Sequence, residues 1–236
     1  MIRQRELGEA DRILVLYSLE RGKLSAVAKG MKRPRSKLAG SLQLFSHASV
    51  QLAAGRSLEV ATQARAIDFH YNLRRDMARY AHASYAAELL DAFTDEGLSH
   101  PALFELLVST LGAMDAGADP ATLTRAFELK LMARLGYGPE LESCVSCSAG
   151  VGGGRGFSVS QGGVLCRKCL STEGGAPLSA AGLRALRELS ELETEAVAER
   201  RLAPAAREEL GRLMRAFVDF RVERQLRSAA FLTLEE

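Results

Sequence analysis

Arg12-Ile13-Leu14-Val15-Leu16-Tyr17 is the stretch that decides the fold of the first seventy residues. It is a short run of aliphatic and aromatic residues that ends before the turn-like Glu20-Arg21-Gly22. Leu24–Lys29 follows at hairpin distance and stops at Gly30. Two such runs joined by a few turn residues are typical of an antiparallel hairpin. The sequence therefore predicts that the chain begins with β-structure.

A second hairpin is predicted downstream, where Ser49–Leu52 and Leu58–Thr62 flank the turn-like segment 54–57. Several short strands with turns at this spacing, in fewer than eighty residues, favour a small barrel. An open sheet is the alternative that the pattern leaves possible.

Beyond Asp76 the apolar residues recur at three- and four-residue steps, which is the spacing of one helix face. Asp119-Pro120 has the pattern of an N-cap followed by the first helical residue. The first predicted helix has face residues from Met77 to Phe93. The other predicted helical segments are Pro101–Ala116, Pro120 through Leu131 with a stop at Gly136, Ser179–Glu195 and Ala205–Arg227. The apolar side of the last segment carries Leu210, Leu213, Met214, Phe217, Phe220 and Val222.

This change of period predicts an α+β protein with two domains. We expect a β-barrel over residues 1–74 and a helical domain over residues 75–236, with a cysteine-containing insert at 141–172. The chain has 236 residues, of which 47% are hydrophobic and 25% charged, a balance typical of soluble, core-forming proteins. No apolar run approaches the roughly 20 residues that cross a bilayer, and the N-terminus lacks the apolar segment of a secretory signal. We therefore expect a cytoplasmic protein with no membrane partner, whose thiols stay reduced.

All four cysteines of the chain lie in one constellation, in which two Cys-x-x-Cys pairs are separated by eighteen residues. The members are Cys144, Cys147, Cys166 and Cys169. Two such knuckles supply the tetrahedral sulfur set that structural zinc accepts, and the residues between them have the pattern of a β-hairpin that would bring the knuckles together. The spacing favours structural zinc. An iron–sulfur cluster, a redox pair and a catalytic zinc remain the alternatives.

The positive charge of the chain is concentrated in one stretch, because no Asp or Glu occurs between Arg21 and Leu58. Lys29–Lys37 places five cations in nine residues around a Gly and a Pro, which predicts a loop able to follow a phosphate backbone. Aromatic residues that could stack on bases are few near this stretch, namely Tyr17, Phe45, Phe69 and Tyr71, and the chain has no Trp. This favours contacts to the phosphate backbone over base stacking. A solvated loop with no ligand is the alternative.

Catalytic motifs are missing from the sequence. It contains no Gly-x-x-x-x-Gly-Lys-Ser/Thr phosphate loop, no Gly-x-Ser-x-Gly elbow and no His-Glu-x-x-His helix. We therefore expect no catalytic residues and a protein that is not an enzyme.

Several stretches of the chain resemble the bacterial recombination mediator family RecO. They are, in family order, residues 8–13, 20–30, 33–36, 38–43, 125–131, 135–137 and 162–166 ahead of Cys169. Only seven residues precede Gly8, whereas the family pattern usually has a fuller first strand. Either that strand is short here or the natural start lies upstream.

The resemblance implies an N-terminal OB-fold joined to a helical domain with a zinc-binding insert. It also implies a nucleoid-associated protein that binds single- and double-stranded DNA and anneals complementary strands without nucleotide hydrolysis. The implied partners are RecR and strands covered by single-stranded-DNA-binding protein, onto which RecA is loaded. The DNA-binding residues would be Lys23, Lys29, Lys32, Arg33, Arg35 and Lys37, and the acid-free stretch adds Arg56. The competing hypothesis is a zinc-ribbon scaffold or regulator whose basic loop contacts nucleic acid only incidentally.

Overall fold

The computed structural model describes residues 1–151, 156–222 and 225–232. The chain folds into two compact units, Met1–Ala116 and Gly117–Glu236. Within the described residues, no helix has the length and apolar character needed to cross a membrane.

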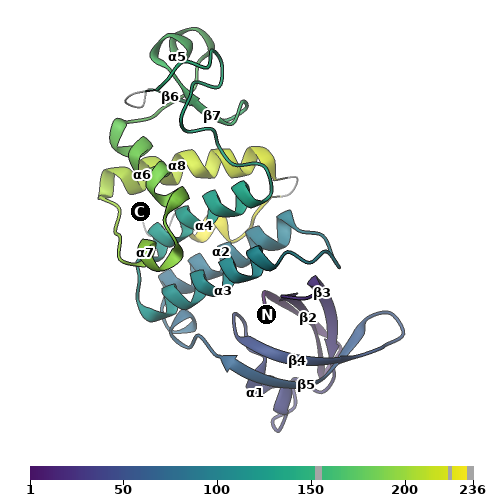
Figure 1. Cartoon of the computed structure of the whole chain (residues 1–236). Helices are drawn as coiled ribbons and strands as arrows, with labels where there is room; N and C mark the ends of the chain where they lie inside the picture. The colour runs from purple at the N-terminus through teal and green to yellow at the C-terminus, as the bar shows by residue number, and fades with distance from the viewer. Residues whose placement is uncertain (152–155, 223–224, 233–236) are drawn as a thin grey trace. The chain divides into compact units, whose positions relative to one another are not determined.

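The first unit begins with a five-stranded barrel whose strands are ordered β1-β2-β3-β5-β4 (Figure 1). β3 pairs with β5 in parallel, and the other neighbouring strands pair antiparallel. This is the five-stranded, partly open Greek-key arrangement of an OB-fold, which confirms the predicted small barrel. The strands are β1 (Arg3–Leu7), β2 (Asp11–Ser18), β3 (Gly22–Ala28), β4 (His47–Ala53) and β5 (Glu59–Asp68).

The barrel interior is filled by alternate residues of its strands, because successive side chains of a strand point to opposite faces. In β3, every second residue is buried from Gly22 to Ala28. Two residues outside the strands, Met31 and Leu42, also enter this core, and Met31 is only 4% exposed. The buried core residues are Leu14, Leu16, Leu24, Ala26, Ala28, Met31, Leu42 and Ala61.

Helices follow the barrel at the predicted position. Asp76 caps α2 (Met77–Phe93) by accepting a hydrogen bond from the Arg79 backbone N–H at 3.0 Å, and α3 (Pro101–Ala116) has the predicted bounds. Among the helices described in the first unit, two short ones were not predicted, α1 (Lys37–Ser41) and the 3₁₀ turn η1 (Asn72–Arg74). Both are shorter than two turns, so they carry little periodic signal.

An ion pair attaches α2 to the barrel. Lys23 Nζ of β3 lies 3.2 Å from Asp91 Oδ1 of α2 and also donates to the Asp91 carbonyl at 2.7 Å. Ser25 donates to Glu96 just beyond the helix at 2.6 Å. These contacts group α2 and α3 with the barrel in the first unit. The predicted domain division at residue 74 follows the change from strand to helix and stays a prediction.

The second unit is built around α4 (Pro120–Arg134), whose residues from Thr122 to Met132 are all buried. Asp119 caps this helix by accepting from the Thr122 N–H at 2.9 Å, and Pro120 occupies its first turn, as predicted. α4 packs against α6 (Ala180–Glu191), α7 (Thr194–Ala198) and α8 (Pro204–Arg221). A short helix, α9 (Ala229–Leu232), follows.

Three details of the second unit differ from the sequence prediction. The segment predicted as helical over Ser179–Glu195 is divided between α6 and α7, because Leu192 and Glu193 adopt extended backbone angles. The segment predicted over Ala205–Arg227 is helical only to Arg221, and residues 223–224 lie outside the described residues. Phe220, predicted on the apolar side of this helix, is 60% exposed.

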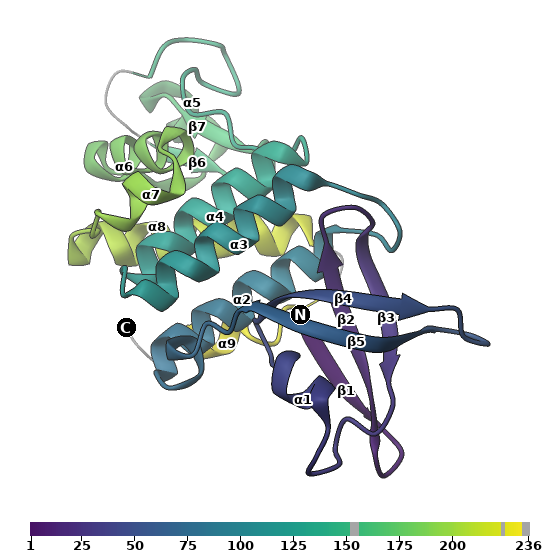
Figure 2. The same cartoon turned by 60° about the horizontal axis from the view of Figure 1, so that its bottom comes forward.

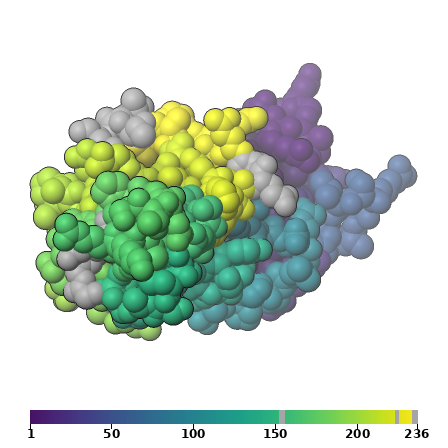
Figure 3. All heavy atoms as spheres, turned by 90° about the horizontal axis from the view of Figure 1, so that it is seen from above, coloured from purple at the N-terminus to yellow at the C-terminus, as the bar shows by residue number. Residues whose placement is uncertain are grey.

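The segment between α4 and α6 contains the cysteine insert and three short strands. β6 (Gly156–Ser158) pairs antiparallel with β7 (Gly163–Leu165), which confirms the predicted hairpin. α5 (Arg167–Glu173) follows, and β8 (Ala176–Pro177) adds to the free side of β6. Figure 3 shows the surface of this green segment from above. Residues 152–155, which include most of the glycine-rich stretch, lie outside the described residues.

A glycine at the start of β3 allows the close approach of the segment after α2. Gly22 has a φ of +62°, and a Cβ atom there would lie 1.8 Å from the Leu98 carbonyl oxygen. We expect Gly22→Ala to lower the free energy of unfolding of the first unit by about 1–3 kcal/mol, because it adds backbone strain to a steric clash. Thermal or urea unfolding measures this effect.

The matched control is Gly40→Ala, because a Cβ atom at Gly40 would meet nothing within 4 Å. Equal stability of the two variants would contradict the proposed role of Gly22.

Candidate nucleic-acid interface and metal centre

The segment Lys29–Lys37, called the basic loop below, connects β3 to α1 and is held to the barrel at its first half. The Gly30 backbone N–H donates to Asp11 Oδ1 at 2.7 Å, and the Lys32 N–H donates to the Ala10 carbonyl at 2.9 Å. Between these two bonds, the Met31 side chain is buried in the barrel core. The loop is therefore fixed by the same core that holds the barrel together.

The second half of the basic loop is a tight turn that leads into α1. The Arg33 N–H donates to the Gly30 carbonyl at 3.1 Å, and the Ser36 N–H donates to the Arg33 carbonyl at 3.0 Å. Ser36 then caps α1 by accepting from the Ala39 N–H at 3.3 Å. These bonds satisfy the backbone internally, so the side chains at the apex are left to point outward.

The cations of the basic loop are exposed, and most have no carboxylate partner. Among the described residues, no ion pair is formed by Lys29, Arg33, Arg35 or Lys37. Lys32 differs, since its Nζ lies 3.0 Å from Glu6 Oε1, and the hydrogen bond from Lys32 lowers the pKa of Glu6. Glu6 is 71% exposed, and surface pairs of this kind contribute little to stability. A phosphate can therefore replace the Glu6 carboxylate.

Two other predicted residues lie elsewhere on the barrel. Arg56 is exposed in the turn between β4 and β5, which projects from the barrel at a corner separate from the basic loop (Figure 2). The side chain of Lys23 is only 13% exposed and is bound by the 5% exposed Asp91, which Arg3 also approaches at 3.4 Å. This geometry indicates a structural role for Lys23. The main candidates for phosphate contact are therefore the four basic-loop cations that form no ion pair among the described residues, Lys29, Arg33, Arg35 and Lys37.

The face that OB-folds commonly use for oligonucleotides, over their second and third strands, is closed in this structure. Ile13 and Val15 alternate with core residues Leu14 and Leu16 and so point away from the core, yet they are only 8% and 4% exposed. Tyr17, one of the aromatic candidates, is 6% exposed, and burial raises the pKa of its phenol. Phe45 is also buried. Of the four aromatic candidates, only Phe69 and Tyr71 reach the surface.

The four cysteine sulfurs meet in one cluster, with all Sγ atoms within 4.8 Å of one another. Cys144 and Cys147 lie on the loop before β6, Cys166 caps α5, and Cys169 lies within that helix. Tetrahedral zinc with Zn–S bonds of about 2.3 Å separates its sulfurs by about 3.8 Å. The Cys147 and Cys166 sulfurs are 3.7 Å apart, which fits this separation and is too long for a disulfide. The cluster can hold a metal ion.

The backbone around the cluster favours thiolates. Burial opposes ionisation of Cys144, but N–H groups of Cys166, Cys147 and Ser146 point at its sulfur and lower its pKa to about 6. The pKa of Cys166 is lowered mainly by the backbone N–H of Cys169. Since a thiolate is the form that binds a metal, these N–H groups favour a cation at Cys144 and Cys166. At Cys169 the Ser146 hydroxyl also favours the thiolate, but the neighbouring Cys147 sulfur and burial raise the pKa of Cys169 to about 12.

Glu173 joins the parts of the insert that surround the sulfur cluster. Its carboxylate accepts hydrogen bonds from Ser146 in the first knuckle and from Gln161 Nε2 in the hairpin turn, the latter at 2.8 Å. The insert is also bound to α8, where Arg221 donates to the Val159 carbonyl at 3.1 Å and lies 3.9 Å from the Phe217 ring centroid. Sequence reasoning did not single out Glu173 or Arg221, because their partners lie 12 to 62 residues away in the chain.

Fold and site define a class of protein: an OB-fold barrel with an exposed cationic loop, followed by a helical region whose insert gathers four thiols. Residues 1–70 match the family model "Recombination protein O N terminal", and residues 74–230 match "Recombination protein O C terminal". The chain belongs to the RecO family of DNA repair proteins.

Curated relatives agree with this assignment. The DNA repair protein RecO of Symbiobacterium thermophilum is 39% identical over 237 residues, covering 98% of this chain and 94% of the relative. That of Roseiflexus sp. is 38% identical over 98% of this chain and 82% of the relative. That of Pelotomaculum thermopropionicum is 36% identical, covering 98% and 91%.

Replacing one thiol tests the metal centre. We expect Cys144→Ser to reduce bound metal to well below about one equivalent per chain, because three thiolates no longer complete a tetrahedral set. The segment 141–172 should then exchange its amide hydrogens faster, while the exchange of the barrel strands changes little. Elemental analysis and hydrogen exchange with mass spectrometry measure the two effects.

The control is Ser171→Ala, an exposed position in the same insert. Wild-type protein purified without chelators that contains neither zinc nor iron would remove the basis for this metal site.

Proposed function

We propose that this chain is a DNA-binding and strand-annealing protein rather than an enzyme. It binds single- and double-stranded DNA and anneals complementary strands without nucleotide hydrolysis. With RecR, it assists the loading of RecA onto strands covered by single-stranded-DNA-binding protein. Membership of the RecO family supports the DNA-repair context, and the parts played by RecR and RecA rest on family resemblance alone.

The observation that carries the DNA-binding proposal is the anchored basic loop. Met31 fixes the loop to the barrel core, while Lys29, Arg33, Arg35 and Lys37 are exposed and lack carboxylate partners among the described residues. Cations held without partners bind a polyanion at little cost in reorganisation. Lys32 joins this surface when its exposed pair with Glu6 opens, and Arg56 adds a separate contact.

Annealing without a fuel source follows from these charges. Two DNA strands repel each other through their phosphates, and a cationic surface that binds both lowers this repulsion and raises their local concentration. Base pairing then supplies the driving force. Contacts to phosphates carry no sequence information, so binding of this kind is largely independent of sequence.

The proposed metal is a structural zinc ion held by Cys144, Cys147, Cys166 and Cys169. The separation of 3.7 Å between two of the sulfurs supports zinc. The ion would cross-link the insert and would take no part in any reaction of DNA.

Charge reversal in the basic loop tests the binding surface. We expect Arg33→Glu with Arg35→Glu to weaken both single- and double-strand affinity by about tenfold or more at low salt. The slope of log affinity against log salt should fall in magnitude by about two, one for each lost phosphate contact. Fluorescence anisotropy over a series of salt concentrations measures both quantities.

The matched control is Arg184→Glu with Arg212→Glu, which changes net charge equally at exposed positions of α6 and α8. If the loop and control variants lose equal affinity, net charge rather than the basic loop determines binding.

Annealing distinguishes the proposed function from a scaffold that contacts DNA incidentally. We expect the protein to accelerate pairing of complementary oligonucleotides without ATP, and we expect the acceleration to fall steeply between about 50 and 200 mM salt. The Arg33→Glu, Arg35→Glu variant should lose binding and acceleration together. Tight DNA binding with no acceleration at either salt concentration would favour the scaffold.

A further inference from the structure

A sharp turn at the end of β5 places an aromatic side chain on the surface. His70 adopts a φ of +45°, and its N–H donates to Asp68 Oδ1 at 2.9 Å. Its ring is 3% exposed and lies with Nδ1 2.9 Å from the Phe45 carbonyl oxygen. A buried side chain and a side chain–backbone bond thus fix a backbone conformation that is rare outside glycine.

This turn brings its two flanking aromatic rings together. Phe69 and Tyr71 stack with ring centroids 5.0 Å apart and an angle of 22° between their planes. The Arg74 guanidinium lies 5.6 Å from the Tyr71 centroid and is itself held by bonds to the Leu44 and Phe69 carbonyls at 2.8 and 2.7 Å. Tyr71 is therefore fixed in position, although 56% of its surface remains open to solvent.

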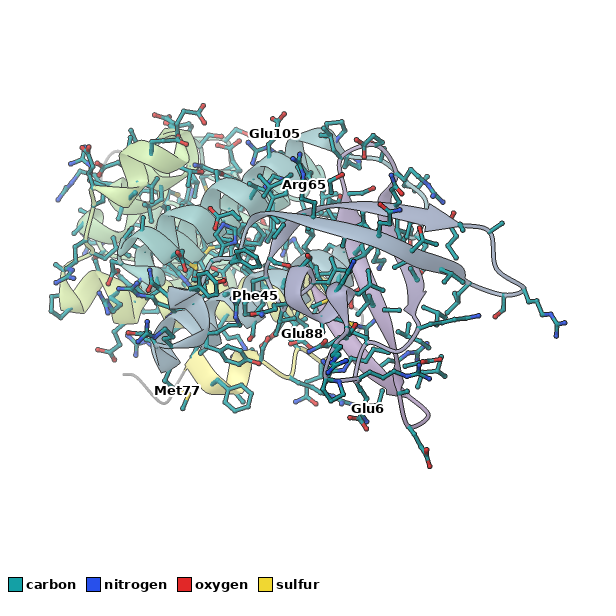
Figure 4. All side chains as sticks on the ribbon, turned by 90° about the horizontal axis from the view of Figure 1, so that it is seen from below. Glu6, Phe45, Arg65, Met77, Glu88 and Glu105 are labelled. Atoms are coloured by element: carbon teal, nitrogen blue, oxygen red, sulfur yellow. The ribbon has the colours of Figure 1, made fainter. Side chains whose placement is uncertain are left out.

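Exposed apolar and cationic residues also follow Tyr71 within nine positions of the chain. Tyr80 is 41% exposed and Met77 is 82% exposed. Met77 projects outward from the start of α2, whereas Phe45 lies between strands and helices (Figure 4). Arg75 is exposed and forms no ion pair within the described residues. The Nη2 nitrogen of Arg74 is buried, and it has no hydrogen-bond partner among the described residues. The patch thus combines the exposed Tyr71 with Arg75, a cation that no carboxylate neutralises within the described residues.

The patch is connected to the basic loop through α1. The basic loop ends at Lys37, α1 runs to Ser41 and packs on β5, and three residues later the Leu44 carbonyl accepts the Arg74 bond. At 1.5 Å per helical residue and about 3.5 Å per extended residue, Lys37 and Leu44 are at most about 17 Å apart. Even at the stacked rise of about 3.4 Å per nucleotide this distance is at most about five nucleotides, so one short single strand can reach from the basic loop to the patch.

We propose that Tyr71 is a stacking site for an unpaired base of single-stranded DNA whose phosphates are bound by the basic loop. Arg75 binds a neighbouring phosphate, and Phe69 and Arg74 hold the Tyr71 ring in place. Unpaired bases expose their faces and duplex bases do not, so this site distinguishes single strands from duplex. The proposal rests on the proposed function, because it requires DNA on the basic loop.

The test compares two kinds of DNA. We expect Tyr71→Ala to weaken binding of an oligothymidylate of about 16 nucleotides by at least about fivefold, and to leave affinity for a duplex of equal length within about twofold. Tyr71→Phe keeps the ring and should retain the single-strand affinity. Anisotropy titrations at one salt concentration measure these values, and unchanged thermal unfolding shows that the variants fold.

Two comparison variants separate the possible failures. Tyr137→Ala removes a tyrosine of similar exposure, 52%, in the second unit and should change neither affinity. If Tyr71→Ala leaves single-strand binding intact while Arg33→Glu with Arg35→Glu weakens it, the stacking site is wrong and the proposed function stands. If neither Tyr71→Ala nor the double charge reversal weakens single-strand binding, the stacking site and the proposed function are both wrong. Equal losses for single strand and duplex would also overturn the stacking role.

Discussion

The ion pair between Lys23 and Asp91 determines which surfaces of the barrel stay open. Both groups are largely withdrawn from water, so an unpaired charge at either position would be costly. The pair holds because Lys23 also donates to the Asp91 carbonyl and Arg3 approaches the second carboxylate oxygen. It fixes α2 beside β3, on the side where the outward residues of β2 are buried. The barrel is left with loops, rather than a strand face, for the proposed contact with DNA.

The basic loop is suited to this role because its two requirements are met by different residues. Asp11 and Met31 provide the anchor, one by a hydrogen bond to the backbone and the other by burial. The cations at the apex are then free to bind phosphates, since none of them is needed to hold the loop. A buried cation such as Lys23 cannot do both, because leaving Asp91 would strand a carboxylate in the interior.

Local patterns predicted much of the fold and part of the site. Asp119 is a capping residue recognisable from the proline that follows it, and the cysteine spacing indicates a cluster around one hairpin. Both features depend on residues close together in the chain. The role of Lys23 could not be predicted in this way, because its partner lies 68 residues away. The same holds for Tyr71, whose exposure depends on a turn fixed by the Phe45 carbonyl. Charge density in a sequence identifies a segment, but tertiary contacts decide which of its charges are available.

The scarcity of exposed aromatic residues on this barrel is consistent with annealing. A protein that stacks many bases competes with the complementary strand for the same base faces, and each stacked base adds about 1–3 kcal/mol to the cost of release. Phosphate contacts leave the bases free to pair. On the proposed function, a surface whose loop has four cations without ion pairs among the described residues, and few exposed aromatic residues, holds a strand mainly by its backbone. On the proposed function, one stacked base is enough to favour a single strand, and the remaining bases stay available to the incoming complement.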